Sequence, residues 1–213
     1  MAFDYKKEYK EFYMPSRGPG IVTVPSMNYM TVRGQGDPNA WQGEYKQSIG
    51  LLYGIAFTLK MSKKSDYRIE GYFDYVVPPL EGFWWQDGAT GIDYACSKGN
   101  FKWISAIRLA DFVTKADLEW AIKEVKKKKK SDFSKVEFLT YDEGVCVQCM
   151  HIGSYDDEPA TIAHMHEYME SRGYVLDITD KRMHHEIYLS DPRKVAPEKL
   201  RTVIRHPIRK MDD

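Results

Sequence analysis

The sequence contains no hydrophobic run that would cross a membrane and carries no net charge. No stretch approaches the roughly 18 consecutive apolar residues that a membrane-spanning helix needs. Lys and Arg supply 31 residues and Asp and Glu supply 31, so the formal net charge is zero. A dedicated nucleic-acid-binding protein normally carries a basic surplus on one face. The sequence therefore predicts neither a membrane partner nor direct binding to nucleic acid.

Cysteine is also scarce, with three residues in 213. An odd, small number of cysteines provides no disulfide framework. Cys146 and Cys149 form a C-x-x-C motif, but the flanking residues are typical of a strand, in which residues three apart point to opposite faces. We therefore predict no metal site and no cofactor. The first ten residues lack the apolar segment of a secretory signal, so we expect a cytoplasmic protein.

Aromatic residues, in contrast, are abundant. They make up 14% of the chain, as 15 Tyr, 9 Phe and 5 Trp, within a hydrophobic content of 43%. Such a chain has either an unusually aromatic core or aromatic rings that bind a ligand, because rings combine large apolar area with specific stacking geometry. We expect Trp41, Trp103 and Trp120 in the core.

The order of predicted elements repeats along the chain. Each half reads as a β-α-β-β unit, about 20–112 for the first and 135–210 for the second, joined by a helix at about 114–130. The first helix is predicted to open at Asp37-Pro38, and the second to stop at Gly173. The predicted strands are 21–33, 67–77, 80–86 and 102–109, then 135–141, 144–152, 183–189 and 200–208.

These units predict an α+β fold in a single domain, residues 1–213. A pseudo-twofold axis would relate the duplicated β-α-β-β units. Their edge strands would pair into one antiparallel sheet, with the helices on one face and an aromatic cleft between the halves. The alternative is a chance similarity between two ordinary α+β segments.

Matched strands in the two halves each carry a glutamate. Alternation places Glu81, Phe83 and Trp85 on one face of their strand, and Glu186 and Tyr188 on one face of theirs. The helices should cover the more apolar faces. We therefore expect both glutamates on the remaining face, lining a ligand cleft. The alternative is that they are surface residues on the open side of the sheet.

Three segments resemble a known family. They are His185-Glu-Ile-Tyr-Leu-Ser-Asp-Pro192, Pro197-Glu-Lys-Leu-Arg-Thr-Val-Ile-Arg-His-Pro207 and His151-Ile-Gly-Ser-Tyr-Asp-Asp-Glu-Pro-Ala-Thr161. They resemble GyrI-like small-molecule-binding domains over about residues 20–210. The resemblance implies a cleft for aromatic, often cationic ligands, with a buried glutamate matched by Glu186. In transcription regulators the domain is fused to a helix-turn-helix, for which this sequence shows no pattern, so it is similar to the stand-alone members.

The segment Val77-Pro-Pro-Leu-Glu-Gly-Phe-Trp-Trp85 further resembles a stand-alone subgroup, the cyclopropanoid cyclopropyl hydrolases. These inactivate DNA-alkylating antibiotics by adding water to a strained cyclopropane. The resemblance implies that Glu186 is the general base and that Tyr188 orients water or donates to the substrate carbonyl. Glu81 then shares the role of base or shapes the opposite wall.

The remaining candidates are aromatic. Phe83, Trp85 and Tyr29 are predicted to stack on the ligand, whereas Trp84 packs on the other face unless the register differs by one residue. A second interpretation is a non-catalytic module that binds, sequesters or senses aromatic or cationic drugs through the same residues. A third is an inhibitor that binds a protein partner. The sequence predicts no oligomeric state.

Overall fold

The computed structural model describes residues 2–88, 91–94 and 97–211. The helices are α1 (Tyr5–Glu8), α2 (Lys10–Tyr13), α3 (Glu44–Lys60), α4 (Lys115–Lys128) and α5 (Glu158–Ser171). The strands are β1 (Gly20–Val24), β2 (Met27–Gln35), β3 (Leu80–Trp85), β4 (Lys102–Arg108), β5 (Val136–Tyr141), β6 (Gly144–Ile152), β7 (Tyr174–Leu176), β8 (His184–Tyr188) and β9 (Arg201–Lys210). No helix of the described residues is long and apolar enough to cross a membrane.

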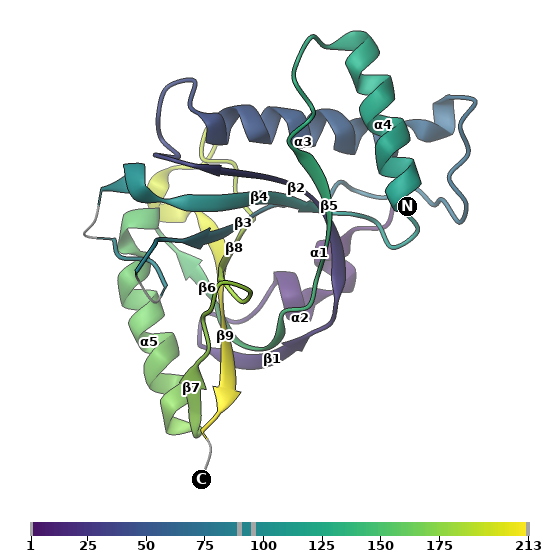
Figure 1. Cartoon of the computed structure of the whole chain (residues 1–213). Helices are drawn as coiled ribbons and strands as arrows, with labels where there is room; N and C mark the ends of the chain where they lie inside the picture. The colour runs from purple at the N-terminus through teal and green to yellow at the C-terminus, as the bar shows by residue number, and fades with distance from the viewer. Residues whose placement is uncertain (1, 89–90, 95–96, 212–213) are drawn as a thin grey trace.

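The strands form one curved antiparallel sheet, as expected (Figure 1). The strand order is β1-β6-β9-β8-β3-β4-β2-β5, with β7 paired to β9. The two predicted units, β2-α3-β3-β4 and β6-α5-β8-β9, occur in mirrored order and meet where β3 pairs with β8. The duplicated architecture predicted from the sequence is therefore confirmed.

The units also exchange their edge strands. Strand β1 lies before the first unit in the chain but pairs with β6 of the second. Strand β5 lies before the second unit but pairs with β2 of the first. Each three-stranded unit is thus completed by a strand that adjoins the other unit in the sequence.

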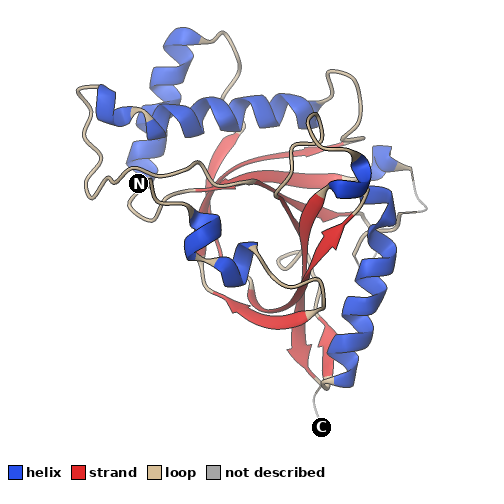
Figure 2. Ribbon diagram, turned by 180° about the vertical axis from the view of Figure 1, so that it is seen from behind, coloured by secondary structure: helices blue, strands red, loops and turns tan. Residues whose placement is uncertain are grey.

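The long helices of the two units lie on the same face of the sheet. Helix α3 crosses β2 and β4, whereas α5 runs along β6 and β7 (Figures 1 and 2). The connecting helix α4 packs on α3 and begins with the predicted capping box, in which Thr114 and Asp117 hydrogen-bond each other's backbone. Helices α1 and α2, which the sequence did not indicate, cover the opposite face (Figure 2).

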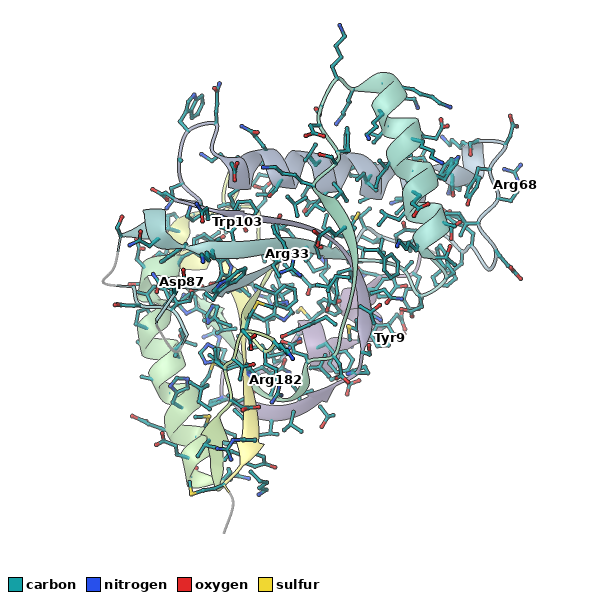
Figure 3. The ribbon with its side chains drawn as sticks, viewed as in Figure 1. Tyr9, Arg33, Arg68, Asp87, Trp103 and Arg182 are labelled. Atoms are coloured by element: carbon teal, nitrogen blue, oxygen red, sulfur yellow. The ribbon has the colours of Figure 1, made fainter. Side chains whose placement is uncertain are left out.

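The core lies between the sheet and these helices. The apolar stripe of α3 is buried through Tyr45, Leu52 and Leu59, and Trp103 packs edge-on against Tyr45 beneath it (Figure 3). A second cluster lies under α5 and comprises Val147, Cys149, Met165, Met169, Ile204 and Ile208. Gly173 ends this helix with a positive φ of 73°, as its position predicted.

Three local predictions were wrong. Helix α3 begins at Glu44 rather than Asp37, because Asp37 accepts a hydrogen bond from the Asn39 backbone in a tight turn. Trp41 therefore lies outside the helix and is 87% exposed instead of in the core. Residues 67–77 form no strand, because both edges of β3 are already paired, with β4 and β8. Trp120 was also predicted in the core. It packs against the core but is only partly buried, and its ring stacks on Tyr67.

The cysteine prediction is confirmed in its geometry. Cys146 pairs with Pro207 and Cys149 with Ile204, three positions apart on β9, so the two side chains point to opposite faces of the sheet. Burial raises the pKa of both thiols, that of Cys149 to about 11. The two residues are therefore buried thiols with different surroundings.

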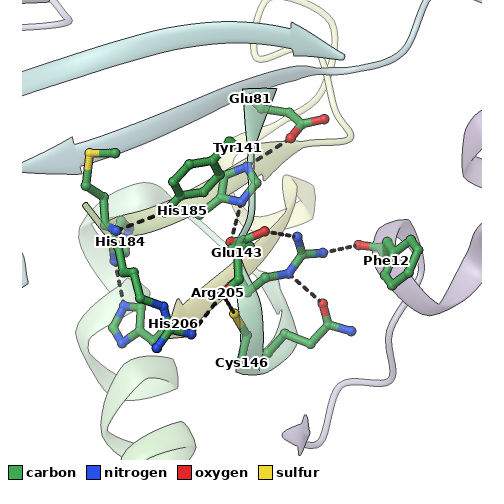
Figure 4. A network of polar contacts seen from close by, with 12 residues as sticks. Phe12, Glu81, Tyr141, Glu143, Cys146, His184, His185, Arg205 and His206 are labelled. Atoms are coloured by element: carbon green, nitrogen blue, oxygen red, sulfur yellow. Dashed lines mark hydrogen bonds and ion pairs between the residues drawn. The ribbon is translucent and has the colours of Figure 1, made fainter. Parts of the chain in front are cut away.

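The face covered by α1 and α2 holds a buried network of charges (Figure 4). Glu143 contacts Arg205 at 2.7 Å and His185 at 2.8 Å, and His185 reaches Glu81 at 2.9 Å. Arg205 also donates to the backbone oxygen of Phe12 in α2. Because two carboxylates face an arginine and a histidine, the network is neutral when His185 is protonated.

The pKa values follow from this pairing. Burial alone would raise the pKa of Glu143, but Arg205 and His185 lower it to about 2. Burial alone would lower the pKa of His185, but Glu143 and Glu81 raise it overall. The network thus favours an ionised Glu143 and a protonated His185.

Removing one partner of this network should destabilise the protein strongly. We expect Arg205→Met to lower the free energy of unfolding by about 3–5 kcal/mol, because it leaves Glu143 buried without its main counter-charge. The matched control is Arg33→Met, since the Arg33–Glu137 pair is about half exposed, with side chains 48% and 53% accessible. The control should change stability by about 0–1 kcal/mol. Equal losses in urea unfolding would contradict a special role for the network.

The lowered pKa of Glu143 predicts that the free energy of unfolding decreases in acid. Its folded-state pKa of about 2 lies below its ordinary value of 4.5, so ionised Glu143 stabilises the fold above about pH 4.5. This contribution, on the order of 3 kcal/mol, is lost as pH falls from 4.5 toward 2. Urea unfolding at several pH values should show a shallower acid loss in Glu143→Gln than in the unmodified protein. Parallel curves would contradict the prediction.

Candidate functional site

The pairing of β3 with β8 decides which glutamates can act together. Gly82 lies directly opposite Glu186, and Glu81 lies opposite Ile187. Residues directly opposite each other share a face of the sheet. Glu186 therefore faces the helices, whereas Glu81 lies on the other face. The prediction that Glu81 and Glu186 line one cleft was wrong, and so was the assignment of Glu186 to the face without long helices.

The aromatic candidates are divided in the same way. Phe83 stacks on His185 with ring centroids 4.1 Å apart and meets Tyr29 edge-on, so both rings lie with Glu81 in the buried charged face. Trp85 is half-buried at the end of β3 and alternates with Trp84. Of the predicted site residues, the structure brings Tyr188 and Trp84 to the face of Glu186. Trp84 and Trp85 thus lie on the predicted faces of β3, but Glu186 lies on the face of Trp84 rather than that of Trp85.

Aromatic rings surround Glu186 on the helix-covered face. The indole N–H of Trp84 donates to the Tyr188 hydroxyl at 2.9 Å. Tyr45 of α3 packs against Trp84 at 5.1 Å, and Tyr155 meets Tyr188 edge-on at 5.8 Å. Burial, and then the charge of Glu186, raise the pKa of Tyr188 well above its usual value, so Tyr188 is a neutral phenol.

A second carboxyl group, Glu158 at the start of α5, lies beside Glu186. Glu158 is 1% exposed, and its Oε2 accepts a hydrogen bond from Tyr94 at 2.8 Å. Its Oε1 has no hydrogen-bond partner within the described part of the chain. Burial, and then the charge of Glu186, raise the pKa of Glu158 well above the usual range. Burial therefore favours the protonated form of Glu158, which can hydrogen-bond Glu186.

Sequence reasoning missed Glu158 and Tyr94. Glu158 follows two aspartates at a helix start, where acidic residues are ordinary, and Tyr94 lies in a loop without a recognisable pattern. The sequence does contain one indication of Glu158, because the segment 151–161, which resembles the family described above, includes it.

A row of histidines approaches Glu186 from the second unit. His184 Nε2 lies 2.9 Å from Glu186 Oε1, and His184 Nδ1 lies 2.7 Å from His206 Nε2. His206 Nδ1 lies 2.9 Å from His166 Nε2 on α5. Because β8 alternates, His184 joins this row while His185 joins the charged network on the other face (Figure 4). The adjacent histidines point apart, as predicted.

Three of these groups also have the kinds of ligand atom that bind metal ions. Glu158, His184 and Glu186 each offer one ligand atom, and these atoms lie within 4.8 Å of one another. In the structure His184 Nε2 is engaged with Glu186 by a hydrogen bond, and Glu158 carries a proton. The arrangement is that of a hydrogen-bonded acid–base pair.

The predicted aromatic cleft is tightly packed. Glu186 is only 8% exposed, and the half-buried rings of Tyr94, Tyr155 and Tyr188 lie over it. Two surface cavities of about 400 and 570 Å³ lie elsewhere, beside α2 and β1 and beside α3 and Lys129. A planar ligand would therefore reach Glu186 by parting these rings.

A family model for the GyrI-like small molecule binding domain matches residues 19–209. The chain belongs to the GyrI-like family. A crystal structure of an uncharacterized conserved protein from Listeria innocua is 47% identical, has a TM-score of 0.91, and covers 97% of this chain and 100% of its own. A crystal structure of a hydrolase from Listeria innocua is 46% identical and has a TM-score of 0.88. The match covers 97% of this chain and 100% of the hydrolase chain.

The GyrI-like fold also occurs in a more distant protein. The C-terminal domain of EcmrR is 14% identical, with a TM-score of 0.56 over 91% of this chain and 98% of that domain, which shows the fold alone. No curated protein matched the chain.

Gly82 provides a test of this GyrI-like site. A Cβ there would lie 2.5 Å from Trp84 Nε1 and 2.9 Å from the Tyr188 hydroxyl, so Gly82→Ala must separate the two rings. We expect a loss of about 1–3 kcal/mol in unfolding free energy and a changed near-ultraviolet circular dichroism spectrum. The control is Gly50→Ala, at an exposed position of α3 where an added Cβ would have no neighbour within 4 Å. This variant should keep the spectrum and have equal or greater stability. An unchanged spectrum in Gly82→Ala would refute the packing role.

Proposed function

We propose that this GyrI-like protein is a hydrolase that adds water to the cyclopropane of flat, DNA-alkylating cyclopropanoid compounds. The observation that carries the proposal is the buried pair formed by Glu186 and protonated Glu158, since one carboxylate with a neighbouring carboxylic acid supplies both a base and an acid. The 46% identity to proteins described as hydrolases supports it. So does the resemblance of residues 77–85 to that subgroup.

The two carboxyl groups balance the reaction. Glu186 takes a proton from water as the water oxygen bonds to the CH₂ carbon of the ring. The carbon–carbon bond of the cyclopropane breaks, and its electron pair moves through the conjugated dienone to the carbonyl oxygen. That oxygen receives the proton of Glu158, so the product is a phenol with a hydroxyl at the opened carbon. Transfer of a proton from Glu186 to adjacent Glu158 restores the starting state.

The rings hold the substrate against this pair. Trp84, Tyr45 and Tyr155 offer flat apolar surfaces, which favour a planar polycyclic ligand over water. The Tyr188 hydroxyl accepts from Trp84 and also hydrogen-bonds Glu186, so it positions the carboxylate that activates the attacking water. Glu81, Phe83 and Tyr29 support β3 and β8 from the opposite face.

A non-catalytic binder is the second candidate function. A carboxylate buried among aromatic rings, as Glu186 is, also suits a cationic aromatic drug, which it would neutralise while the rings make cation–π contacts. Such a protein would sequester or sense the drug without changing it. The two functions differ in whether the ligand gains a water molecule.

Mass spectrometry of a cyclopropane-bearing duocarmycin-type compound incubated with the protein separates the two functions. We expect the compound to gain one water over many turnovers. Glu186→Gln and Glu158→Gln should each lower kcat by about 10²–10⁴-fold, because each removes one proton-transfer group. Glu119→Gln, an exposed position on α4, is the matched control and should keep full activity. Stoichiometric protection without a mass change would overturn the hydrolase and favour the binder.

A further inference from the structure

Three histidines form a continuous chain that ends on the proposed base. The chain runs from His166 on α5 to His206 on β9, then to His184 on β8 and to Glu186, with successive distances of 2.9, 2.7 and 2.9 Å. His184 and His206 are buried, and His166 is half-buried. All three belong to the second unit, and none is used by the reaction described above.

The hydrogen bonds of this chain have one direction if the rings are neutral. An ionised carboxylate only accepts, so His184 must donate from Nε2 to Glu186. A neutral imidazole carries one N–H, so Nδ1 of His184 must accept from Nε2–H of His206. By the same argument, Nδ1 of His206 accepts from Nε2–H of His166.

Burial favours neutral rings in the outer part of the chain. It lowers the pKa of His206 well below its usual value, and the neighbouring His184 and His166 lower it further. Burial also lowers the pKa of His166. Near neutral pH both rings therefore carry one proton each, which is the state that the directional chain requires.

We propose that His206 and His166 are positioning residues that hold His184 in its Nε2–H tautomer and thereby orient the carboxylate of Glu186. The bond from His184 to Oε1 fixes one oxygen of Glu186 and so sets the direction of the carboxylate that takes the proton from water. Without His206, Nδ1 of His184 would lose its donor, and the ring would lose the partner that fixes its rotation. This inference rests on the proposed function for its catalytic consequence, whereas the tautomers themselves do not depend on it.

Long-range ¹H–¹⁵N correlation spectra of the histidine rings test the chain without any substrate. We expect neutral Nε2–H tautomers for both His184 and His206 at pH 7. In His206→Leu, Nδ1 of His184 loses its donor, so we expect the Nδ1 signal of His184 to shift. A protonated or Nδ1–H His184 in the unmodified protein, or an unchanged His184 in the variant, would overturn the proposal. If His206→Leu does not fold, His166→Leu should shift the Nδ1 signal of His206, and unchanged signals there would overturn it equally.

Activity with two substitutions at one site then tests positioning. His206→Leu removes the donor to His184, and we expect kcat to fall about 10–100-fold, as when an outer hydrogen-bond partner is lost from a functional histidine, with KM changed less than threefold. His206→Gln keeps an N–H donor at the place of Nε2 and should recover most of kcat. His164→Gln, an exposed neighbour on α5, is the control. Equal kcat values in all variants, or a loss confined to KM, would overturn the role.

The two proposals fail in different ways. If the unmodified protein produces no water adduct, the hydrolase proposal fails regardless of the histidines. The spectra then still decide whether the chain sets the tautomer of His184. If turnover occurs but does not depend on His206, the hydrolase proposal stands and the positioning role fails.

Discussion

The arrangement of this protein depends on the alternation of side chains along β8, the strand at which the two units join. His184, Glu186 and Tyr188 point to one face, and His185 and Ile187 point to the other. A strand in the middle of a sheet must satisfy the polar groups of both faces without water. Here each histidine serves a separate set of carboxylates, so the two faces can have different electrostatic properties within a few ångströms.

On the face with Glu143 the carboxylates are paired with full positive charges, whereas on the face with Glu186 burial favours the neutral form of one carboxyl group, Glu158. On the first, Arg205 and His185 compensate Glu143 and Glu81. On the second, no arginine or lysine of the described residues pairs with Glu186 or Glu158, and Glu158 becomes a neutral acid instead. A carboxyl group kept neutral in this way remains available to exchange protons, whereas the salt-bridged Glu143 is held in one state. The first group therefore suits a structural role, whereas the second has the properties required by the proposed chemistry.

Local signals in the sequence predicted much of the fold. The capping box at Thr114, the stop at Gly173 and the repeated order of elements are local or periodic features, and all appear in the structure. The face shared by Glu186 and Trp84 was not predictable, because it depends on pairing between strands about 100 residues apart. Likewise, Glu158 and Tyr94 approach Glu186 through tertiary packing of a helix end and a loop, which leaves no periodic pattern.

The exchanged edge strands have a consequence for synthesis on the ribosome. Strand β1 is made more than 100 residues before its partner β6, and β6 itself also needs β9, which follows it in the chain. Strand β1 therefore waits without its partner until β6 and β9 have been made. Contacts of such long sequence separation slow folding and prolong exposure of strand edges. The nascent chain should accordingly be most vulnerable to aggregation, and most dependent on chaperones, just before β9 emerges.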